Sequence, residues 1–219
     1  MHYGCRMVHL STPDDLALHG VRVLGFATSS RVAGRFGLDA GAVEELLLDY
    51  EASGWVRQAS FADSSGWSLT YRGRTENERR LAVELDRAGG RDIVADVHGA
   101  FLPLNRRFGE VCTDWQMRPT RSDPMALNDH TDWRWDDRVL RTLESLDGAL
   151  RHLGERLSRC LARFGGYADL FSAARHKAAT GERAWVDASD RDSCHLVWMQ
   201  FHEDLLATLG LDRGSDNLA

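Results

Sequence analysis

Signals for a helix, a turn and a second helix follow one another in the stretch Thr28-Ser-Ser-Arg-Val-Ala-Gly-Arg-Phe-Gly-Leu-Asp39. Thr28 is a preferred N-cap residue, because its side-chain oxygen accepts a hydrogen bond from the first turn of a helix. Gly37 favours a helix end, since glycine adopts the left-handed conformation without steric cost. Asp39 is again a preferred N-cap. The stretch therefore predicts a short helix over residues 31–36, a turn, and another helix that begins at Asp39.

The sequence on either side of this pair predicts one more helix before it and a β-hairpin after it. Thr12-Pro-Asp-Asp15 combines a cap, a first-turn proline and two acids that favour the positive end of a helix. The third helix keeps its apolar spacing up to Gly54. Two short strands are expected at residues 55–61 and 67–70, and a helix over residues 71–88 follows them.

Residues 14–88, about a third of the chain, resemble the winged helix-turn-helix domain of bacterial transcriptional regulators of the MarR and PadR type. Besides the opening stretch, two segments carry the resemblance. Asp49-Tyr-Glu-Ala-Ser-Gly-Trp-Val56 matches the end of the third helix and the first wing strand. Gly66-Trp-Ser-Leu-Thr-Tyr-Arg-Gly-Arg74 matches the second wing strand and the LTxxGR start of the next helix. The resemblance implies binding to double-stranded DNA and dimerisation through the flanking helices.

DNA contacts are assigned from this resemblance to three groups of residues. Arginines would bind the backbone phosphates, the start of the second helix would support backbone contacts, and two small residues would let the third helix approach the groove. These groups are Arg31, Arg35, Arg57, Arg72 and Arg74; Thr28, Ser29 and Ser30; and Ala40 and Gly41.

The third helix departs from the family's pattern. Its polar face carries Glu44, Glu45 and Asp49, and its first residues offer no Arg, Lys, Asn or Gln to read a base edge. The whole chain has a net charge of −6, which argues against indiscriminate nucleic-acid binding through a broad basic face. Two interpretations stay open: DNA binding mainly through the wing and the second helix, or a winged helix used for protein contacts.

After Gly89-Gly90, every periodic segment is typical of a helix, which predicts a domain boundary at this point. The expected organisation is an N-terminal extension (1–13), a winged helix-turn-helix domain (14–90), a helical sensing and dimerisation domain (91–211) and a polar tail (212–219). The fold class is therefore mainly α, with a small β-hairpin wing, followed by an all-α domain.

Three features of the helical half lead to specific expectations. Pro103 interrupts the apolar stripe of residues 91–108, so a kink or a break is expected near Leu102. The acidic, Trp-rich residues 128–137 are expected to form a loop that caps the next helix through Asp136 or Asp137. That helix carries apolar residues at alternating spacings of four and three from Val139 to Phe164. Such a stripe serves as an intramolecular core, as a dimer seam, or as both.

Aromatic and histidine side chains concentrate in this half and suggest a small-molecule pocket, because pockets combine apolar walls with a few polar groups. The alternative is a core whose Trp N–H groups are hydrogen-bonded. The expected ligand contacts are His98, Asp114, Trp115, His130, His195, Trp198 and His202.

Neither a metal site nor a catalytic site is expected from the remaining patterns. His195 and His202 are seven residues apart, too far for the adjacent pair of a helical zinc motif, so a zinc site would need both of them to converge with His98. Cys194 and His195 point about 100° apart on a helix and therefore cannot form a nucleophilic pair. A His/Asp acid–base site stays chemically possible, so an enzyme is not excluded.

The sequence thus predicts a ligand-responsive transcriptional regulator without a cofactor. Scattered cysteines without CxxC spacing indicate a reducing cytoplasm, and no apolar run is long enough to span a membrane. The expected partners are double-stranded DNA, a small-molecule effector and a second copy of the chain. The alternative is a repurposed winged-helix protein that does not read DNA and that binds or transforms a small molecule in its helical domain.

Overall fold

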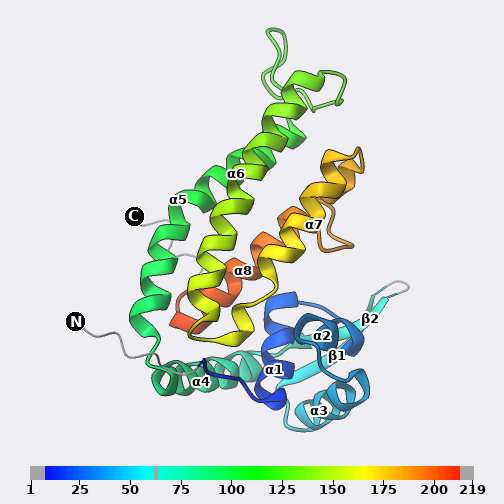
Figure 1. Cartoon of the computed structure of the whole chain (residues 1–219). Helices are drawn as coiled ribbons and strands as arrows, with labels where there is room; N and C mark the ends of the chain where they lie inside the picture. Colours follow the sequence, from blue (N-terminus) through cyan, green and yellow to red (C-terminus); the bar gives the residue numbers. More distant parts are fainter. Residues whose placement is uncertain (1–7, 62–63, 213–219) are drawn as a thin grey trace, which may run out of the picture. The chain divides into compact units, whose positions relative to one another are not determined.

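The computed structural model of the protein describes residues 8–61 and 64–212 (Figure 1). These residues form two compact units. The first unit contains the described residues up to Val94 together with 158–163 and 202–212, and the second contains 95–157 and 164–201. The expected extension and polar tail lie outside the described part over residues 1–7 and 213–219.

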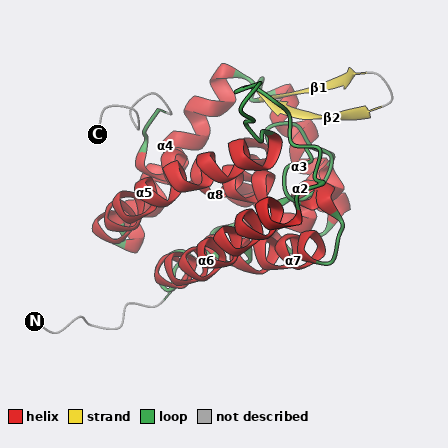
Figure 2. Ribbon diagram, turned by 90° about the horizontal axis from the view of Figure 1, so that it is seen from above, coloured by secondary structure: helices red, strands yellow, loops and turns green. Residues whose placement is uncertain are grey.

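The chain is mainly helical and has a small antiparallel hairpin, as the sequence predicts (Figure 2). The first unit begins with three helices and continues with the hairpin and a long helix. It also takes up the start of α5 (Arg91–Gln116) and the end of α8 (Cys194–Leu209). Its own elements are α1 (Pro13–Leu24), α2 (Ser29–Phe36), α3 (Ala40–Ala52), β1 (Val56–Phe61), β2 (Ser64–Leu69) and α4 (Tyr71–Ala88).

Local capping signals explain where these helices begin. The side chains of Thr12, Thr28, Asp39 and Thr70 each accept a hydrogen bond from the backbone N–H three residues further on. Such caps satisfy N–H groups that have no partner within the helix. Gly37 ends α2 in the left-handed conformation, with φ 67°. The predicted caps at Thr12, Thr28 and Asp39 and the predicted turn are thereby confirmed, although α2 begins at Ser29, two residues before its predicted start.

The hairpin pairs Val56 with Leu69 and Gln58 with Trp67. Strand β2 begins at Ser64, three residues before the predicted strand. The Ser-Ser-Gly sequence reads locally as a turn, but β1 provides pairing partners for these residues. Trp67 also pairs with Ala27 as an isolated bridge, with N–O distances of 2.8 and 3.2 Å. Residues 62 and 63 of the expected turn lie outside the described part.

One hydrophobic core joins α1, α2, α3 and the hairpin. Its buried members come from every one of these elements, and their burial supplies the main favourable free energy of the unit. They are Ala17, Leu18, Val21, Ala27, Val32, Ala33, Val43, Leu47, Tyr50, Val56 and Trp67.

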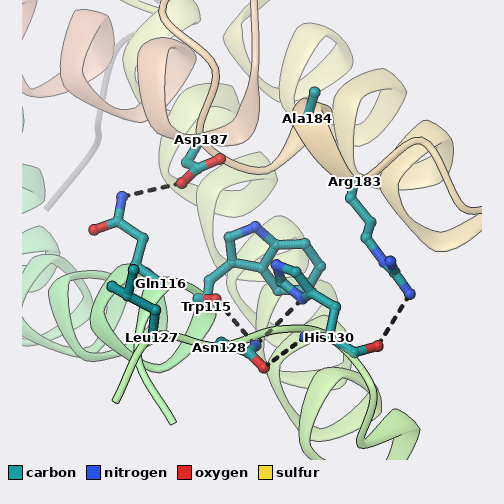
Figure 3. Close-up of a pocket in the computed structure, with 8 residues that line it drawn as sticks. All are labelled: Trp115, Gln116, Leu127, Asn128, His130, Arg183, Ala184 and Asp187. Carbon is teal, nitrogen blue, oxygen red and sulfur yellow. Dashed lines mark hydrogen bonds between the residues drawn. The ribbon is translucent and has the colours of Figure 1, made fainter. Parts of the chain in front are cut away.

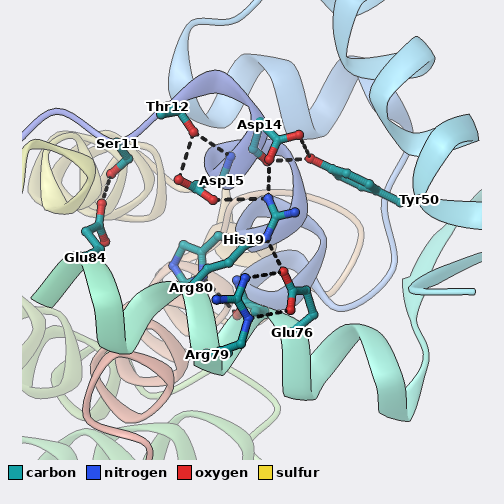
Figure 4. A network of polar contacts seen from close by, with 11 residues as sticks. Ser11, Thr12, Asp14, Asp15, His19, Tyr50, Glu76, Arg79, Arg80 and Glu84 are labelled. Atoms are coloured by element: carbon teal, nitrogen blue, oxygen red, sulfur yellow. Dashed lines mark hydrogen bonds and ion pairs between the residues drawn. The ribbon is translucent and has the colours of Figure 1, made fainter. Parts of the chain in front are cut away.

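Polar contacts fix α4 against the start of α1 (Figure 4). Arg80 of α4 bonds to Glu76 on its own helix and reaches both Asp14 and Asp15 of α1. The hydroxyl of Tyr50 donates to the carbonyl oxygen or the carboxylate of Asp14, both at 2.7 Å. The first turn of α1 is therefore tied to α3 and α4 at the same carboxylate.

A buried ionic cluster ties the distant segments 158–163 and 202–212 into this unit. Arg163 donates to Glu84 (2.9 Å), to the hydroxyl of Thr208 (2.7 Å) and to Asp204. His19 of α1 lies 3.0 Å from Asp204. Arg163 and Asp204 expose only 1% and 0% of their side chains. Burial alone would raise the pKa of Asp204, but Arg163 and His19 outweigh it and hold this pKa well below its usual range.

A second arginine extends the cluster. Arg22 of α1 donates to Glu203 and to Glu78 of α4, each at 2.8 Å. The cluster therefore connects α1, α4, residue 163 and the end of α8. Buried charges of this kind hold a structure together only while all their partners are present.

The second unit is all helical. It is built from most of α5 (Arg91–Gln116), α6 (Trp133–Ser158), Phe164 of the short η1 (Ala162–Phe164), α7 (Tyr167–Ala179), η2 (Arg183–Trp185) and the first half of α8 (Cys194–Leu209). In the described part of the chain, none of the helices combines the length and the apolar character that a membrane crossing needs.

Two local expectations for this unit need correction. Helix α5 continues through Pro103, so the expected break near Leu102 is wrong, while the alternative of a kink stays a prediction. Val97, Phe101 and Phe108 are buried on the same helix and hold both halves in place. Helix α6 begins at Trp133 and is capped by Asp132, whose carboxylate accepts from the N–H of Arg134 at 3.1 Å. The cap is therefore neither Asp136 nor Asp137.

The apolar stripe of α6 is buried within the single chain. Val139, Leu143, Leu146, Leu150, Leu153 and Leu157 are each exposed by 4% or less. The stripe was expected to lie on one helix up to Phe164. The helix instead ends at Ser158, and the last part of the stripe lies in a turn and in η1 (Ala162–Phe164). Asp147 of α6 also accepts from Ser172 and Arg175 of α7 (2.5 and 2.9 Å). This stripe acts as an intramolecular core, and the homodimer remains a prediction that needs another surface.

Replacing Arg163 by Ala should lower the free energy of unfolding by about 3–5 kcal/mol, because Glu84 and Asp204 would stay buried without their cation. The exposed Arg159 provides the control, and Arg159→Ala should change stability by less than about 0.5 kcal/mol. Chemical denaturation monitored by circular dichroism measures both. Equal stability of the two variants would contradict the structural role of the cluster.

Gly73 allows α4 to lie against the turn that precedes β1. A Cβ atom at this position would lie 1.8 Å from the carbonyl oxygen of Trp55, whereas a Cβ at Gly34 would meet nothing within 4 Å. We expect Gly73→Ala to destabilise the protein by roughly 3 kcal/mol or more. Gly34→Ala in α2 should instead stabilise it by up to about 1 kcal/mol. Thermal denaturation of both variants tests this opposite sign.

Candidate functional site

A cavity of about 460 Å³ opens on the second unit (Figure 3). Three segments of the unit contribute its walls: the end of α5, the loop that follows α5, and the region around η2. The lining residues are Trp115, Gln116, Leu127, Asn128, His130, Arg183, Ala184 and Asp187.

The loop after α5 folds back on the helix end and places Asn128 and His130 against Trp115. Backbone bonds join Arg118 to Ala126 and Asn128 to Gln116 (both 2.9 Å). The side-chain amide of Asn128 donates to the carbonyl oxygen of Trp115 at 3.0 Å. These bonds fix the position at which the chain turns into the cavity.

His130 adopts a positive φ of 59°, which among the described non-glycine residues occurs only here. Its backbone N–H donates to the side-chain oxygen of Asn128 at 3.1 Å, and this bond stabilises the uncommon conformation. Such conformations cost free energy and are found disproportionately at functional sites. The uncommon backbone conformation of His130 therefore suggests that its side chain is held in place for a function.

A buried carboxylate orients the ring of His130. Its Nδ1 lies 3.0 and 3.1 Å from the two carboxylate oxygens of Asp136. The same carboxylate accepts from Asn128 at 2.9 Å. The amide nitrogen of Asn128 also lies 3.2 Å from Nδ1, but its two hydrogens are used by Trp115 and Asp136. Because a carboxylate only accepts, the proton of the neutral His130 ring belongs on Nδ1, and Nε2 then carries the lone pair. A neutral histidine in this state accepts a hydrogen bond from a ligand at Nε2.

Aromatic and cationic groups complete the cavity. The rings of Trp115 and His130 lie 4.5 Å apart between centroids. Arg183 donates to the carbonyl oxygen of His130 at 3.2 Å, while its side chain remains 57% exposed. Gln116 donates to Asp187 on the opposite wall at 3.0 Å (Figure 3). The cavity thus offers a guanidinium, an imidazole lone pair and an indole to one bound molecule.

Of the residues expected to contact a ligand, the cavity brings together Trp115 and His130. The others lie elsewhere. Trp198 is fully buried, stacks on Phe108 with centroids 4.6 Å apart, and donates to Asn105. His195 also stacks on Phe108, with ring centroids 6.3 Å apart.

The remaining expected contacts fall into different parts of the chain. The half-buried His98 and Asp114 lie on α5 in the second unit, and Asp114 accepts from the indole of Trp135 through its backbone oxygen at 2.6 Å. His202 is buried in the first unit. Among the described residues, no group of three or more His, Cys, Asp and Glu side chains is placed to hold a metal ion.

The two cysteines of the second unit are not suited to nucleophilic catalysis. Burial, with a smaller effect of Asp187, raises the pKa of the Cys112 thiol to about 12. Burial, with Asp147, raises the pKa of the Cys194 thiol to about 12. Both are therefore thiols and not thiolates at neutral pH.

The arginines expected to bind phosphate have different surroundings. Arg35 donates to the carbonyl oxygen of Arg163 at 3.3 Å and lies over the ring of Phe36. Arg74 is half exposed and lies 3.9 Å from Glu203. Arg57 and Arg72 are exposed, on β1 and at the start of α4. Arg31 is half-buried on α2.

The start of α2 and the face of α3 are accessible. Thr28 and Ser30 are exposed and Ser29 is half-buried, with Thr28 engaged as the cap. Ala40 and Gly41 are exposed, but so are the acids Glu45 and Asp49 of the same helix, and Glu44 is half-buried. Helix α3 therefore presents small residues at its start and negative charge along its length.

Comparison with models of protein families, with curated proteins and with solved structures finds no match to this chain.

The tautomer of His130 provides a direct test of the site. Nitrogen-15 NMR of the neutral ring should show a protonated Nδ1 and an unprotonated Nε2. Asp136→Ala should shift the proton toward Nε2, because the acceptor at Nδ1 is lost. Asp137→Ala, which removes the neighbouring carboxylate, should leave the His130 signals unchanged. A proton on Nε2 in the unaltered protein would contradict this assignment.

Proposed function

We propose that the protein is a ligand-responsive transcriptional regulator whose first unit is a winged helix-turn-helix domain that binds DNA. The second unit binds a small molecule in the cavity around His130. The observation that carries the proposal is the α2–Gly37–α3 pair followed by an antiparallel hairpin on one core. In DNA-binding proteins with such a helix pair, the second helix enters the major groove of the DNA. We expect the hairpin to contact the phosphate backbone of the DNA.

DNA contact is expected mainly from the hairpin and the start of α4. Arg57 and Arg72 are exposed, and neither pairs with a carboxylate among the residues that the structure describes. Such arginines bind phosphates and release counterions from the duplex. Ala40 and Gly41 leave room for a close approach of α3, while Glu45 and Asp49 disfavour its deep insertion because they repel phosphate.

The cavity favours a ligand with two complementary groups. Arg183 supplies donors for an anionic group, and Nε2 of His130 accepts from a hydroxyl or an amine. The volume of about 460 Å³ lies in the range of small-molecule pockets. A ligand that binds one conformation of the protein more tightly shifts the population toward it, which is the basis of a regulated DNA contact.

The acidic face of α3 favours a second candidate function. A winged helix that has lost DNA reading would be free to carry Glu45 and Asp49 at these positions. In that case the small-molecule cavity of the second unit is the functional site, and the first unit serves protein contacts.

Salt-dependent DNA binding separates the two functions. For a regulator, the double variant Arg57→Ala/Arg72→Ala should bind every duplex more weakly and reduce the slope of log K against log salt by about 2. The control is Arg87→Ala/Arg91→Ala, which removes two exposed charges from the other end of α4 and the start of α5. Fluorescence anisotropy at two salt concentrations measures the slopes. Absence of binding by the unaltered protein at low salt would favour the second function.

A further inference from the structure

A second cavity of the helical unit is lined by three guanidinium groups. Its volume is about 390 Å³, and its lining residues are Arg107 of α5 and Arg138, Arg141 and Thr142 of α6. The chain as a whole carries 33 acids against 27 bases, yet none of the carboxylates that the structure describes lines this cavity. The gathering of positive charge is therefore local and runs against the overall charge of the protein.

Most of this charge is not compensated. Arg141 pairs with Asp137, one turn earlier on α6. Arg107 and Arg138 form no ion pair in the part of the chain that the structure describes. Like charges that share a concave surface create a strong positive potential, because the low-dielectric walls focus the field. A bound anion would relieve this repulsion.

The donors come from two helices, and one of them is restricted before any ligand arrives. Arg138 and Arg141 are three residues apart and share one face of α6, and Arg107 reaches the cavity from α5. The guanidinium of Arg138 lies over the ring of Trp135, 4.2 Å from its centroid, which restricts its side chain. The hydroxyl of Thr142 donates to the carbonyl oxygen of Arg138 at 3.0 Å, so the N–H groups offered to a ligand come from the arginines.

We propose that this arginine cavity binds a small molecule with two or more phosphate groups, such as a nucleoside diphosphate or pyrophosphate. Guanidinium groups match phosphate oxygens in paired hydrogen bonds, which a single ammonium cannot do. Two uncompensated arginines from two helices suit two phosphate groups better than one. The site is separate in its lining residues from the cavity around His130 and does not depend on DNA binding by the first unit.

Calorimetric titration of the full chain with pyrophosphate tests the proposal. The double variant Arg107→Gln/Arg138→Gln should bind about 100-fold more weakly, roughly 10-fold for each charge-assisted contact. The matched control is Arg121→Gln/Arg134→Gln in the same unit. It also removes two exposed charges, one of which lies over a tryptophan. The control should change the affinity by less than about 3-fold.

NMR spectra of the unaltered protein provide a second measurement that needs no variant. The Nε–H signals of Arg107 and Arg138 should shift on titration with pyrophosphate, while those of Arg121 and Arg134 stay in place. Absence of heat and of these shifts would overturn the proposal, as would an equal loss of affinity in both double variants. Equal affinity for inorganic phosphate would overturn the assignment to several phosphate groups. Binding of duplex DNA alone, lost in Arg107→Gln/Arg138→Gln, would overturn the assignment to a small molecule.

Discussion

The buried guanidinium of Arg163 is the constraint on which the first unit depends, because it joins segments that are far apart in the chain. It binds Glu84 of α4 and both Asp204 and Thr208 of α8. His19 of α1 meets it at the same carboxylate. A buried charge has a large desolvation cost unless every partner is in place. Each charge of this cluster has its partner only when the end of α8 lies against α1 and α4.

The elements of the first unit were predictable from sequence because their signals are local. Thr28 and Asp39 each need only the next three residues to act as caps. The partners of Arg163 carry no such signal, since charged residues on helices are usually solvent-exposed. The sequence therefore assigned residues 158–163 and 202–211 to the helical half, although they pack with the first unit. In α6, the expected cap was Asp136 or Asp137, but Asp132 is the residue whose carboxylate accepts from the first turn.

The candidate site was predictable in its residue types but only partly in its members. Trp115 belongs to the tryptophans of the helical half, and His130 to the acidic, Trp-rich residues 128–137. Asp136 was interpreted as a cap, and its true role depends on the left-handed backbone of His130, which brings the ring back over α6. Arg183 reaches the cavity from a segment that lies 53 residues after His130 in the sequence. The arginine cavity likewise depends on how α5 and α6 pack, which periodicity does not specify.

The first unit is built from segments that are far apart in the chain, and this affects how it forms during synthesis. Arg22 and Glu203 are 181 residues apart, so the arginine leaves the ribosome long before its carboxylate partner is made. At typical elongation rates this interval is roughly 10–40 s. During that time the residues of the hydrophobic core have been made but the acids of α8 have not, so Arg22 and His19 still lack these partners. The N-terminal unit thus reaches its final structure only when the last helix of the described chain emerges, and not in the order in which its own helices are translated.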